Sequence, residues 1–407
     1  MRRHSDRAHE ARARRGYVGV VVSADTHEID GIEPRSVVRA TSEAEVVEAI
    51  RGANERSEAI VLSGGATRLD AGDPPARYDV SLDLSGLRGI VEYEPDDLVT
   101  TVRAGTTLGE LAEALAARGQ RWPVEPGLPH RATVGGTLAS AAGGPSRLRY
   151  FHPRDWVIGA RVVLGDGTTV HSGGRVVKNV TGYDLTRLWS GTFGTLAALV
   201  EMTLKLTAIP ERTVSLLAEM DLSAAFAAAK ALQASGMPID ALAIVTGDAV
   251  GALDARGDAA LIVRLTGPAA AVRRLGRDVR ERVRCRDVAN EVWDRVAALP
   301  LQAKWTARVA WPAATTPSIE FTGYAAVIYP ATSTAYLLHA IDRAAFRKIR
   351  ASLEETGGIA VVERGTAEYK RDVGGAWGVP RVPLGIARAL KERFDPRGVL
   401  APGRVPL

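Results

Sequence analysis

Glycine is concentrated in the middle of this sequence, and it is the residue type that best lets a backbone approach a ligand. Thirteen of the 41 glycines lie between Gly127 and Gly194, more than an even spread would place there. Because glycine has no Cβ atom, its backbone can adopt positive φ angles and come close to a bound molecule. Successive backbone N–H groups in such turns can hold an anion, most often a phosphate. The stretch therefore predicts a backbone-lined site for a large phosphorylated ligand.

The spacing of these glycines differs from that of the common nucleotide-binding motifs. The sequence contains no Gly-x-x-x-x-Gly-Lys-Ser/Thr, so a P-loop kinase or ATPase has little support. No Gly-x-Gly-x-x-Gly lies between a strand and a helix, which disfavours a Rossmann dinucleotide site.

The pattern resembles the FAD-binding domain of the vanillyl-alcohol-oxidase type, also called the PCMH type. Within that superfamily the sequence is most similar to the FAD-binding subunits of bacterial glycolate oxidases. The resemblance covers residues 35–209 and continues more weakly at the C-terminus. It is carried by the segments Ala132 to Gly136, Arg154-Asp155, Lys178 to Leu185 and Gly191 to Leu206.

The resemblance implies that FAD lies between two lobes of the first domain, with its isoalloxazine ring facing the second domain. Residues 63–68 and 132–136 would line the pyrophosphate and ribityl groups. Residues 127–129, 143 and 144 would approach the isoalloxazine, and residues 194, 195 and 200 would contact the cofactor through backbone atoms. The candidate cofactor-binding residues are Ser63, Gly64, Gly65, Ala66, Thr67, Arg68, Pro126, Gly127, Thr133, Val134, Gly135, Gly136, Gly143, Gly144, Asp155, Lys178, Gly194, Thr195, Val200 and Arg404.

Lys178 and Arg404 are the cations that the motifs place best. A reduced flavin gathers negative charge near N1 and the C2 carbonyl, and a fixed cation there raises its potential. The alternative interpretation of Lys178, a solvated hairpin lysine, is the more common one for such a residue. Arg404 follows Pro402-Gly403 in a segment similar to the C-terminal signature of the family, in which the tail returns to the flavin domain. Ala401 replaces the usual Asn of that signature, so this position has no side-chain amide to form a hydrogen bond.

The histidines indicate how the flavin is held. Relatives that attach FAD covalently use a His or Cys near the loop at residues 63–68, and this loop has neither, so we expect non-covalent FAD. The catalytic glycolate oxidase subunit and D-lactate dehydrogenases carry a His-rich metal cluster in the second domain. Only His339 lies beyond residue 171 here, so we expect no metal site and assign no catalytic residue. Among the other, scattered histidines, His152 beside Arg154-Asp155 is the best target for mutation.

A second stretch similar to the family runs from Glu363 to Gly378. Glu363, Arg364 and Trp377 are candidates to face the flavin or an adjoining subunit. An ion pair and a core tryptophan explain the same residues equally well.

Two classes of function are consistent with the resemblance. The first is an FAD-dependent oxidoreductase subunit that oxidises a 2-hydroxy acid, such as glycolate to glyoxylate. Its electrons would pass through the flavin within a complex that includes a catalytic flavoprotein subunit and an iron–sulfur subunit. The second is a non-catalytic, FAD-stabilised subunit that assembles the complex, which the missing metal ligands favour. A stand-alone FAD-dependent oxidase of another alcohol or a sugar is a more remote alternative.

Composition narrows the class of protein further. The 407 residues are enough for two domains, and 46% apolar with 24% charged residues is typical of a globular chain. The lone Cys285 excludes an internal disulfide and a self-contained iron–sulfur cluster. No run of about 18 apolar residues predicts a transmembrane helix. We expect a cytoplasmic protein, or one held at the inner face of the membrane through its partners.

The net charge of +5 has a local origin. Residues 1–15 contain six arginines against Asp6 and Glu10, without the apolar segment of a signal peptide. We expect a disordered basic tail over residues 1–30; an alternative is a tail that binds an acidic partner. Elsewhere positive and negative residues interleave, which argues against nucleic acid binding.

The resemblance implies a two-lobed PCMH-type domain over residues 31–210 in an α+β fold, whose elements must position the candidate site. A strand at residues 34–39, a helix at 42–53 and a strand at 59–62 lead into the glycine loop. Residues 79–84 and 89–93 alternate like paired strands. A hairpin is predicted around Gly165-Asp166-Gly167, followed by a strand at residues 196–206 with its even-numbered side chains on one face.

A smaller α+β cap domain is predicted over residues 211–407, with a tail that returns to the flavin domain. Strands alternate there with alanine-rich helices, including one near residues 288–298. Such alternation with short links predicts helices stacked on one antiparallel sheet.

Overall fold

The computed structural model describes residues 27–174, 184–313, 315, 319–380 and 383–406. Most of the predicted basic tail and the candidate Lys178 lie outside these residues. None of the helices within the described ranges is long and apolar enough to cross a membrane.

The first lobe is a small parallel sheet next to one helix. Strands β1 (Ser36–Arg39), β3 (Val80–Asp83) and β2 (Ile60–Ser63) pair in that order. Helix α2 (Glu43–Arg56) buries Val46, Ile50 and Ala53 against them. Because β2 ends at Ser63, the glycine loop begins at the carboxyl edge of the sheet.

The second lobe is a five-stranded antiparallel sheet in the order β4-β5-β9-β7-β8. The predicted hairpin is confirmed as β7 and β8. The predicted pairing of residues 79–84 with 89–93 is wrong, because β3 belongs to the parallel sheet and β4 pairs with β5. The strands of this lobe are β4 (Ile90–Glu94), β5 (Val99–Arg103), β7 (Val157–Leu164), β8 (Thr169–Gly173) and β9 (Ala197–Lys205).

A bulge divides β9 into two halves, and the side chains of even-numbered residues point to opposite faces of the sheet in the two halves. Val162 pairs with Leu199 and Arg161 pairs with Glu201, so Val200 has no opposite residue. Ala198 and Val200 pack into the core of the first lobe, whereas Met202 and Leu204 pack into the core of the second. The prediction that all even-numbered side chains share one face is therefore wrong, because an extra residue reverses the faces of a strand.

Short helices and a two-stranded pair complete the second lobe. They are α3 (Leu108–Ala116), α4 (Val134–Ala139), α5 (Arg147–Tyr150), α6 (Leu185–Leu188), and the pair β6 (Gln120–Arg121) and β10 (Thr207–Ala208). Helix α4 packs against β9 and the end of β5, so its glycines lie where the two lobes meet.

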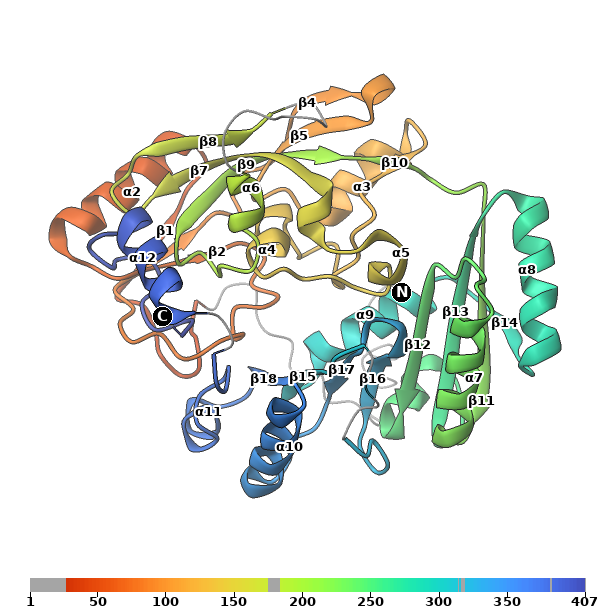
Figure 1. Ribbon diagram of the computed structural model, residues 1–407. Coiled ribbons are helices and arrows are strands. Elements are labelled where there is room, and N and C mark those ends of the chain that lie inside the picture. The colour runs from red at the N-terminus through yellow and green to blue at the C-terminus, as the bar shows by residue number, and fades with distance from the viewer. Residues whose placement is uncertain (1–26, 175–183, 314, 316–318, 381–382, 407) are drawn as a thin grey trace, which may run out of the picture.

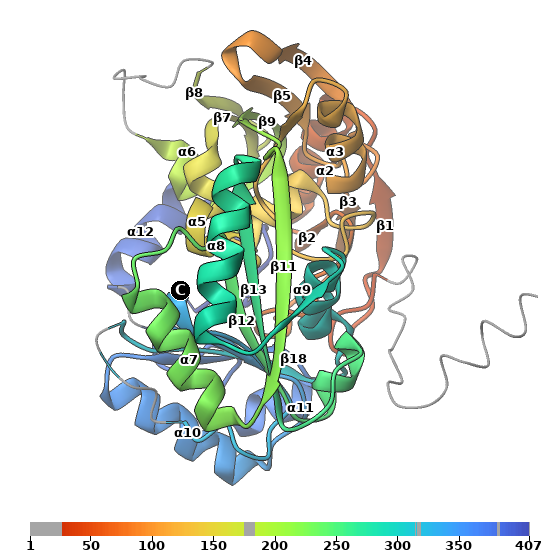
Figure 2. The same ribbon diagram turned by 90° about the vertical axis from the view of Figure 1, so that its right-hand side faces the viewer.

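The remaining sheet has eight antiparallel strands in the order β14-β11-β13-β12-β16-β17-β15-β18. Helices α7 (Leu222–Ala234), α8 (Ala269–Arg282) and α10 (Arg343–Glu355) cover one face, and α9 (Val292–Gln302) covers the other (Figures 1 and 2). The strands are β11 (Arg212–Met220), β12 (Ala241–Thr246), β13 (Ala259–Gly267), β14 (Arg286–Val288), β15 (Thr306–Ala310), β16 (Ala326–Tyr329), β17 (Thr334–Leu337) and β18 (Ile359–Arg364). The helix expected near 288–298 begins only at Val292, because Val288 ends β14.

The chain ends against the first lobe. After α11 (Ala367–Asp372) and α12 (Leu384–Phe394), Leu400 forms a parallel bridge with Ile60, and the buried Asp395 accepts bonds from the backbone of Val399 and Leu400. The segment after α12 contacts α2, because Arg397 Nη1 donates to the carbonyl oxygen of Asn54 at 2.8 Å.

The division into domains at residues 210 and 211 stays a proposal. It is supported by strand pairing, since β10 pairs with β6 whereas β11 pairs within the eight-stranded sheet.

Candidate functional site

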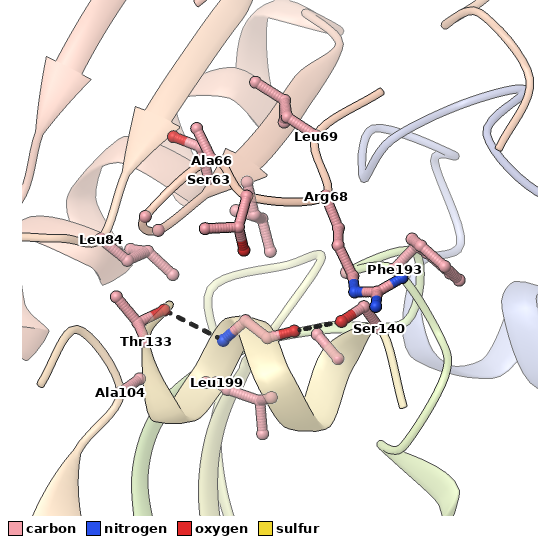
Figure 3. Close-up of a pocket in the computed structure, with 18 of the residues that line it drawn as sticks. Ser63, Ala66, Arg68, Leu69, Leu84, Ala104, Thr133, Ser140, Phe193 and Leu199 are labelled. Atoms are coloured by element: carbon pink, nitrogen blue, oxygen red, sulfur yellow. Dashed lines mark hydrogen bonds between the residues drawn. The ribbon is translucent and has the colours of Figure 1, made fainter. Parts of the chain in front are cut away.

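A cavity of about 830 Å3, measured with the solvent at its mouth, lies between the two lobes of the first domain (Figure 3). Its walls come from the loop after β2, from α4 and from the start of β9. Of the residues predicted from the sequence, it brings together Ser63, Gly64, Gly65, Ala66, Thr67, Arg68, Thr133, Gly135, Gly136, Gly194 and Arg404. Two loops far apart in the sequence thus share one site.

The glycines at residues 64 and 65 are required by the close approach of these two loops. A Cβ atom on Gly65 would lie 1.6 Å from the carbonyl oxygen of Arg131, and one on Gly64 would lie 2.5 Å from Thr133 Oγ1. Ala66, the next residue, has a left-handed backbone with φ of 53°. Only glycine permits such contact between two backbones.

The loop presents unused hydrogen-bond donors. Within the described part of the chain, the backbone N–H groups of residues 64–67 donate to no protein acceptor. The buried hydroxyl of Ser63 also has no partner there. Buried polar groups normally find partners, so a bound group is expected to supply them. A run of backbone N–H groups beside a hydroxyl fits the two phosphates of a dinucleotide.

Helix α4 forms the opposite wall. Thr133 Oγ1 accepts a bond from Gly136 N at 3.2 Å, and Ser140 Oγ donates to Gly136 O at 2.7 Å, as Figure 3 shows. A Cβ on Gly136 would meet only Thr133 Oγ1, whereas a Cβ on Gly135 would lie 2.8 Å from the Cβ of Ala104. Gly136 therefore borders open space, and Gly135 allows α4 to pack on the end of β5.

Apolar side chains that sequence reasoning missed complete the cavity. Leu199 lines the cavity, whereas the predicted Val200 packs into the core of the first lobe. The bulge in β9 determines the direction in which each of these two side chains points. Val134 and Thr195 are buried outside the lining. No local motif marks the additional lining residues, which are Val61, Leu62, Leu69, Leu84, Ala104, Ala139, Ser140, Phe193, Ala197 and Leu199.

A second cavity, of about 370 Å3 when the solvent at its mouth is included, adjoins the eight-stranded sheet and has Arg68 in common with the first. The predicted residues Pro126, Gly143 and Gly144 line it, together with Arg147 and Tyr336. Gly127 lies just behind, where a Cβ would be 2.5 Å from the carbonyl oxygen of Ala297 in α9. The remaining lining residues are Ala297, Pro300, Tyr329, Thr332 and Thr334.

Arg404 has a different role from that of a cation directed at a flavin. Its guanidinium donates to the carbonyls of Leu69, Ala71 and Asp73, and the residue is 2% exposed. Arg404 therefore braces the segment that follows the glycine loop, although it still borders the first cavity.

Asp155 lies outside both cavities. Its carboxylate accepts a bond from the backbone N–H of His152 at 3.0 Å and lies 3.9 Å from the guanidinium of Arg187. The structure thus places this predicted contact away from the cofactor cavity.

Arg68 is the cation that both cavities share. Its Nη1 donates to Glu363 Oε2 at 2.7 Å, and Arg308 Nε donates to Glu363 Oε1 at 2.7 Å. Burial disfavours the charged form of Glu363, but the two guanidinium groups outweigh it and hold the pKa of this carboxyl below its ordinary value. One carboxylate is thus shared by two arginines.

The segment from Glu363 to Trp377 holds the chain that follows the glycine loop. Arg364 Nη2 lies 3.1 Å from Asp70 Oδ2, and the fully buried Lys370 donates to Asp70 O at 2.6 Å. Trp377 Nε1 donates to Arg404 O at 2.9 Å. The sequence left open whether these residues face the flavin or form local contacts. In the structure Glu363 and Arg364 form ion pairs, and Trp377 contacts the backbone of Arg404. Within the ranges described, no group of three or more His, Cys, Asp or Glu residues could hold a metal ion.

Comparison with known families identifies the cofactor. Residues 34–173 match the family model described as an FAD binding domain. The match confirms the prediction of FAD, and the free N–H groups at residues 64–67 fit its pyrophosphate.

Curated relatives share sequence with only part of this chain. Glycolate oxidase subunit GlcE of Escherichia coli is 35% identical over 240 residues, which are 58% of this chain and 63% of the relative. D-2-hydroxyglutarate dehydrogenase of Xanthomonas citri is 36% identical over 177 residues, 44% of this chain and 38% of the relative. Glycolate oxidase subunit GlcD of Bacillus subtilis is 33% identical over 185 residues, 46% of this chain and 39% of the relative. The chain thus spans less than two thirds of each of these relatives.

Solved structures extend the likeness to nearly the whole chain. An alkyldihydroxyacetonephosphate synthase superposes with a TM-score of 0.65 at 17% identity, covering 91% of this chain and 77% of that one. A p-cresol methylhydroxylase with substrate bound gives 0.65 at 17% identity, covering 90% of this chain and 88% of that one. At such low identity these structures show the fold alone, and they confirm the predicted α+β fold of the PCMH type.

Proposed function

We propose that this chain, whose residues 34–173 match an FAD-binding domain, is the FAD-binding subunit of an oxidoreductase acting on the CH–OH group of a small 2-hydroxy acid, such as glycolate. The observation that carries the proposal is that the two cavities have Arg68 as a common lining residue. The first cavity offers phosphate-binding backbone, and the second offers charged and hydroxyl side chains. The relatives that match in sequence include glycolate oxidase subunits and 2-hydroxy acid dehydrogenases.

Each wall has a part in this activity. The loop at residues 64–67 would bind the pyrophosphate through its N–H groups, and Gly136 leaves room for the ribityl chain. Leu62, Leu84 and Leu199 would exclude water from the cofactor. Bound FAD supplies a hydride acceptor that can pass electrons on one at a time. The substrate would enter the second cavity, between Arg68 and the eight-stranded sheet.

The relatives' names support an assembly of several subunits, since two of them are subunits of a glycolate oxidase. On the sequence resemblance we place this chain in a complex with a catalytic flavoprotein subunit and an iron–sulfur subunit. Such a complex would be cytoplasmic, or bound to the inner face of the membrane through its other subunits.

A non-catalytic assembly role is the second candidate, and the electrostatics of the second cavity favour it. Oxidation of a hydroxy acid needs a base for the hydroxyl proton. The pKa of Glu363 is held below its ordinary value by Arg68 and Arg308 despite its burial, so this carboxylate is a weak base. Burial raises the pKa of Tyr329, so its phenol stays protonated near neutral pH. Both groups are poorly suited to take a proton.

Anaerobic reduction separates the two candidates. The purified chain should carry FAD, seen as the visible absorption band of the flavin. If the chain is catalytic alone, glycolate should bleach that band. If it serves in assembly, the band should persist until the partner subunits are added. A chain that binds no FAD would contradict both forms of the proposal.

A further inference from the structure

The arginines at the second cavity outnumber the carboxylates that pair with them. Arg68 and Arg308 share the single carboxylate of Glu363. Arg147, which also lines the cavity, has no carboxylate partner within the described part of the chain. Burial lowers the pKa of the Arg147 guanidinium, and the charges of Arg308 and Arg154 act in the same direction. An uncompensated guanidinium in such surroundings is costly unless an anion joins it.

Two guanidinium N–H groups at this cavity lack acceptors. The Nε atoms of Arg68 and Arg147 are both buried and have no hydrogen-bond partner among the residues that the structure describes. A buried donor without an acceptor costs about 1–3 kcal/mol, more when it is charged. Both arginines therefore have donor capacity left for a ligand.

Arg147 is held in place by its neighbours. Its Nη2 donates to His152 Nε2 at 3.0 Å. Burial, followed by the charges of Arg147 and Arg154, lowers the pKa of His152 and so favours the neutral ring, which can accept this bond. The stem of Arg147 passes over Gly143, where a Cβ would lie 2.2 Å from Arg147 Cδ. Asp155 fixes the backbone of His152 in turn.

We propose that the second cavity is a carboxylate-binding site, in which Arg147 contacts the anion and Arg68 provides a second positive charge. Guanidinium groups match carboxylates in geometry and charge, and their hydrogen bonds to carboxylates are among the strong ones in proteins. Thr334 and Tyr336, in β17, add hydroxyl groups to the same wall. The identification of this anion as the carboxylate of the substrate rests on the proposed function. His152 and Gly143 then act as positioning residues for Arg147.

Calorimetric titration of the FAD-loaded chain with oxalate tests the proposal. Oxalate carries the carboxylate group but has no CH–OH group to oxidise, so binding is measured apart from turnover. Ethylene glycol is the matched neutral probe. We expect saturable binding of oxalate and none of ethylene glycol. Arg147→Gln should weaken oxalate binding by about tenfold or more, because a charge-assisted contact is lost. Arg274→Gln, which removes an exposed arginine of α8, should bind oxalate like the wild type.

Gly143→Ala is a second variant that keeps every charge. Its methyl group must displace the stem of Arg147, so oxalate binding should weaken even though the arginine remains. Retention of FAD by each variant shows that the first domain is folded. Unaltered oxalate affinity in both Arg147→Gln and Gly143→Ala would overturn the proposal, as would the absence of any saturable oxalate binding by the wild type. A chain that binds oxalate but no FAD would instead contradict the proposed function alone.

Discussion

Arg68 and Glu363 lie 295 positions apart in the sequence, and their side chains meet at 2.7 Å. Arg68 belongs to the loop that borders the cofactor cavity, and Glu363 belongs to β18 of the eight-stranded sheet. The contact therefore fixes the flavin loop to the sheet that covers the second cavity. Arg68 lines both cavities.

Removing the Glu363 carboxylate should destabilise the protein. Glu363→Gln leaves Arg68 and Arg308 close together without their common partner, which should cost about 3 kcal/mol in the free energy of unfolding. Urea denaturation followed by intrinsic fluorescence measures this change. Glu368→Gln is the control, because the Glu368–Arg343 pair is exposed and should contribute less than about 1 kcal/mol. Equal effects of the two variants would show that the buried cluster is not important for stability.

The same carboxylate should make stability sensitive to acid. The folded-state pKa of Glu363 lies below its ordinary value of 4.5, so the stabilisation is complete above that value and is lost as the pH falls through the lowered pKa. Glu125 acts in the same sense, because Arg264 lowers its pKa against the effect of burial. Melting temperatures measured from about pH 7 down to about pH 3 should fall steeply only at the acid end. The fall should be shallower in Glu363→Gln, and an unchanged profile would contradict this.

Gly136→Val should abolish FAD binding with little loss of stability. A side chain at this position enters the cofactor cavity and meets only Thr133 Oγ1, at 3.0 Å. Flavin content per chain and a thermal melt measure the two effects separately. Gly135→Val should lower both, because its side chain also collides with Ala104. Gly385→Ala, in the exposed first turn of α12 with nothing within 4 Å, is the matched control. Full FAD content in Gly136→Val would remove α4 from the cofactor site.

The flavin should be bound without a covalent link. Neither a histidine nor a cysteine lies at residues 63–68, where the resemblance places the attachment point of covalent relatives. Precipitation with acid should release all the yellow colour into the supernatant. Colour that remains in the pellet would refute non-covalent binding.

The isolated chain should oxidise glycolate or D-lactate slowly or not at all. Tyr329, which lines the second cavity, and Glu363, which pairs with Arg68 of its lining, have pKa values shifted away from the range that suits proton abstraction. Steady-state assays of the FAD-loaded chain with a dye acceptor measure the rate, with the complete complex as the positive control. A turnover on the order of 10 per second by the chain alone would show that it carries its own substrate chemistry.

The sequence by itself determined the features that depend on local backbone conformation. Glycine at positions 64, 65 and 136 is required wherever the backbone must approach another group, and such requirements appear directly as residue types at fixed spacing. The hairpin around Gly165-Asp166-Gly167 followed from a turn signal in the same way, and the alternation of strands and helices beyond residue 210 indicated the α+β class there.

Only the tertiary structure decided which side chains meet in the two cavities. The motif at the C-terminus indicated Arg404, yet its guanidinium is occupied by three carbonyls, whereas Arg68 and Arg147 carry the unused donors. The sequence predicted Val200 at the cofactor cavity, but Leu199 lines it, because a bulge interrupts the strand at Val200. The physical reason is that charge pairing and strand register are set by contacts between segments far apart in the chain. Local residue patterns carry no record of such contacts.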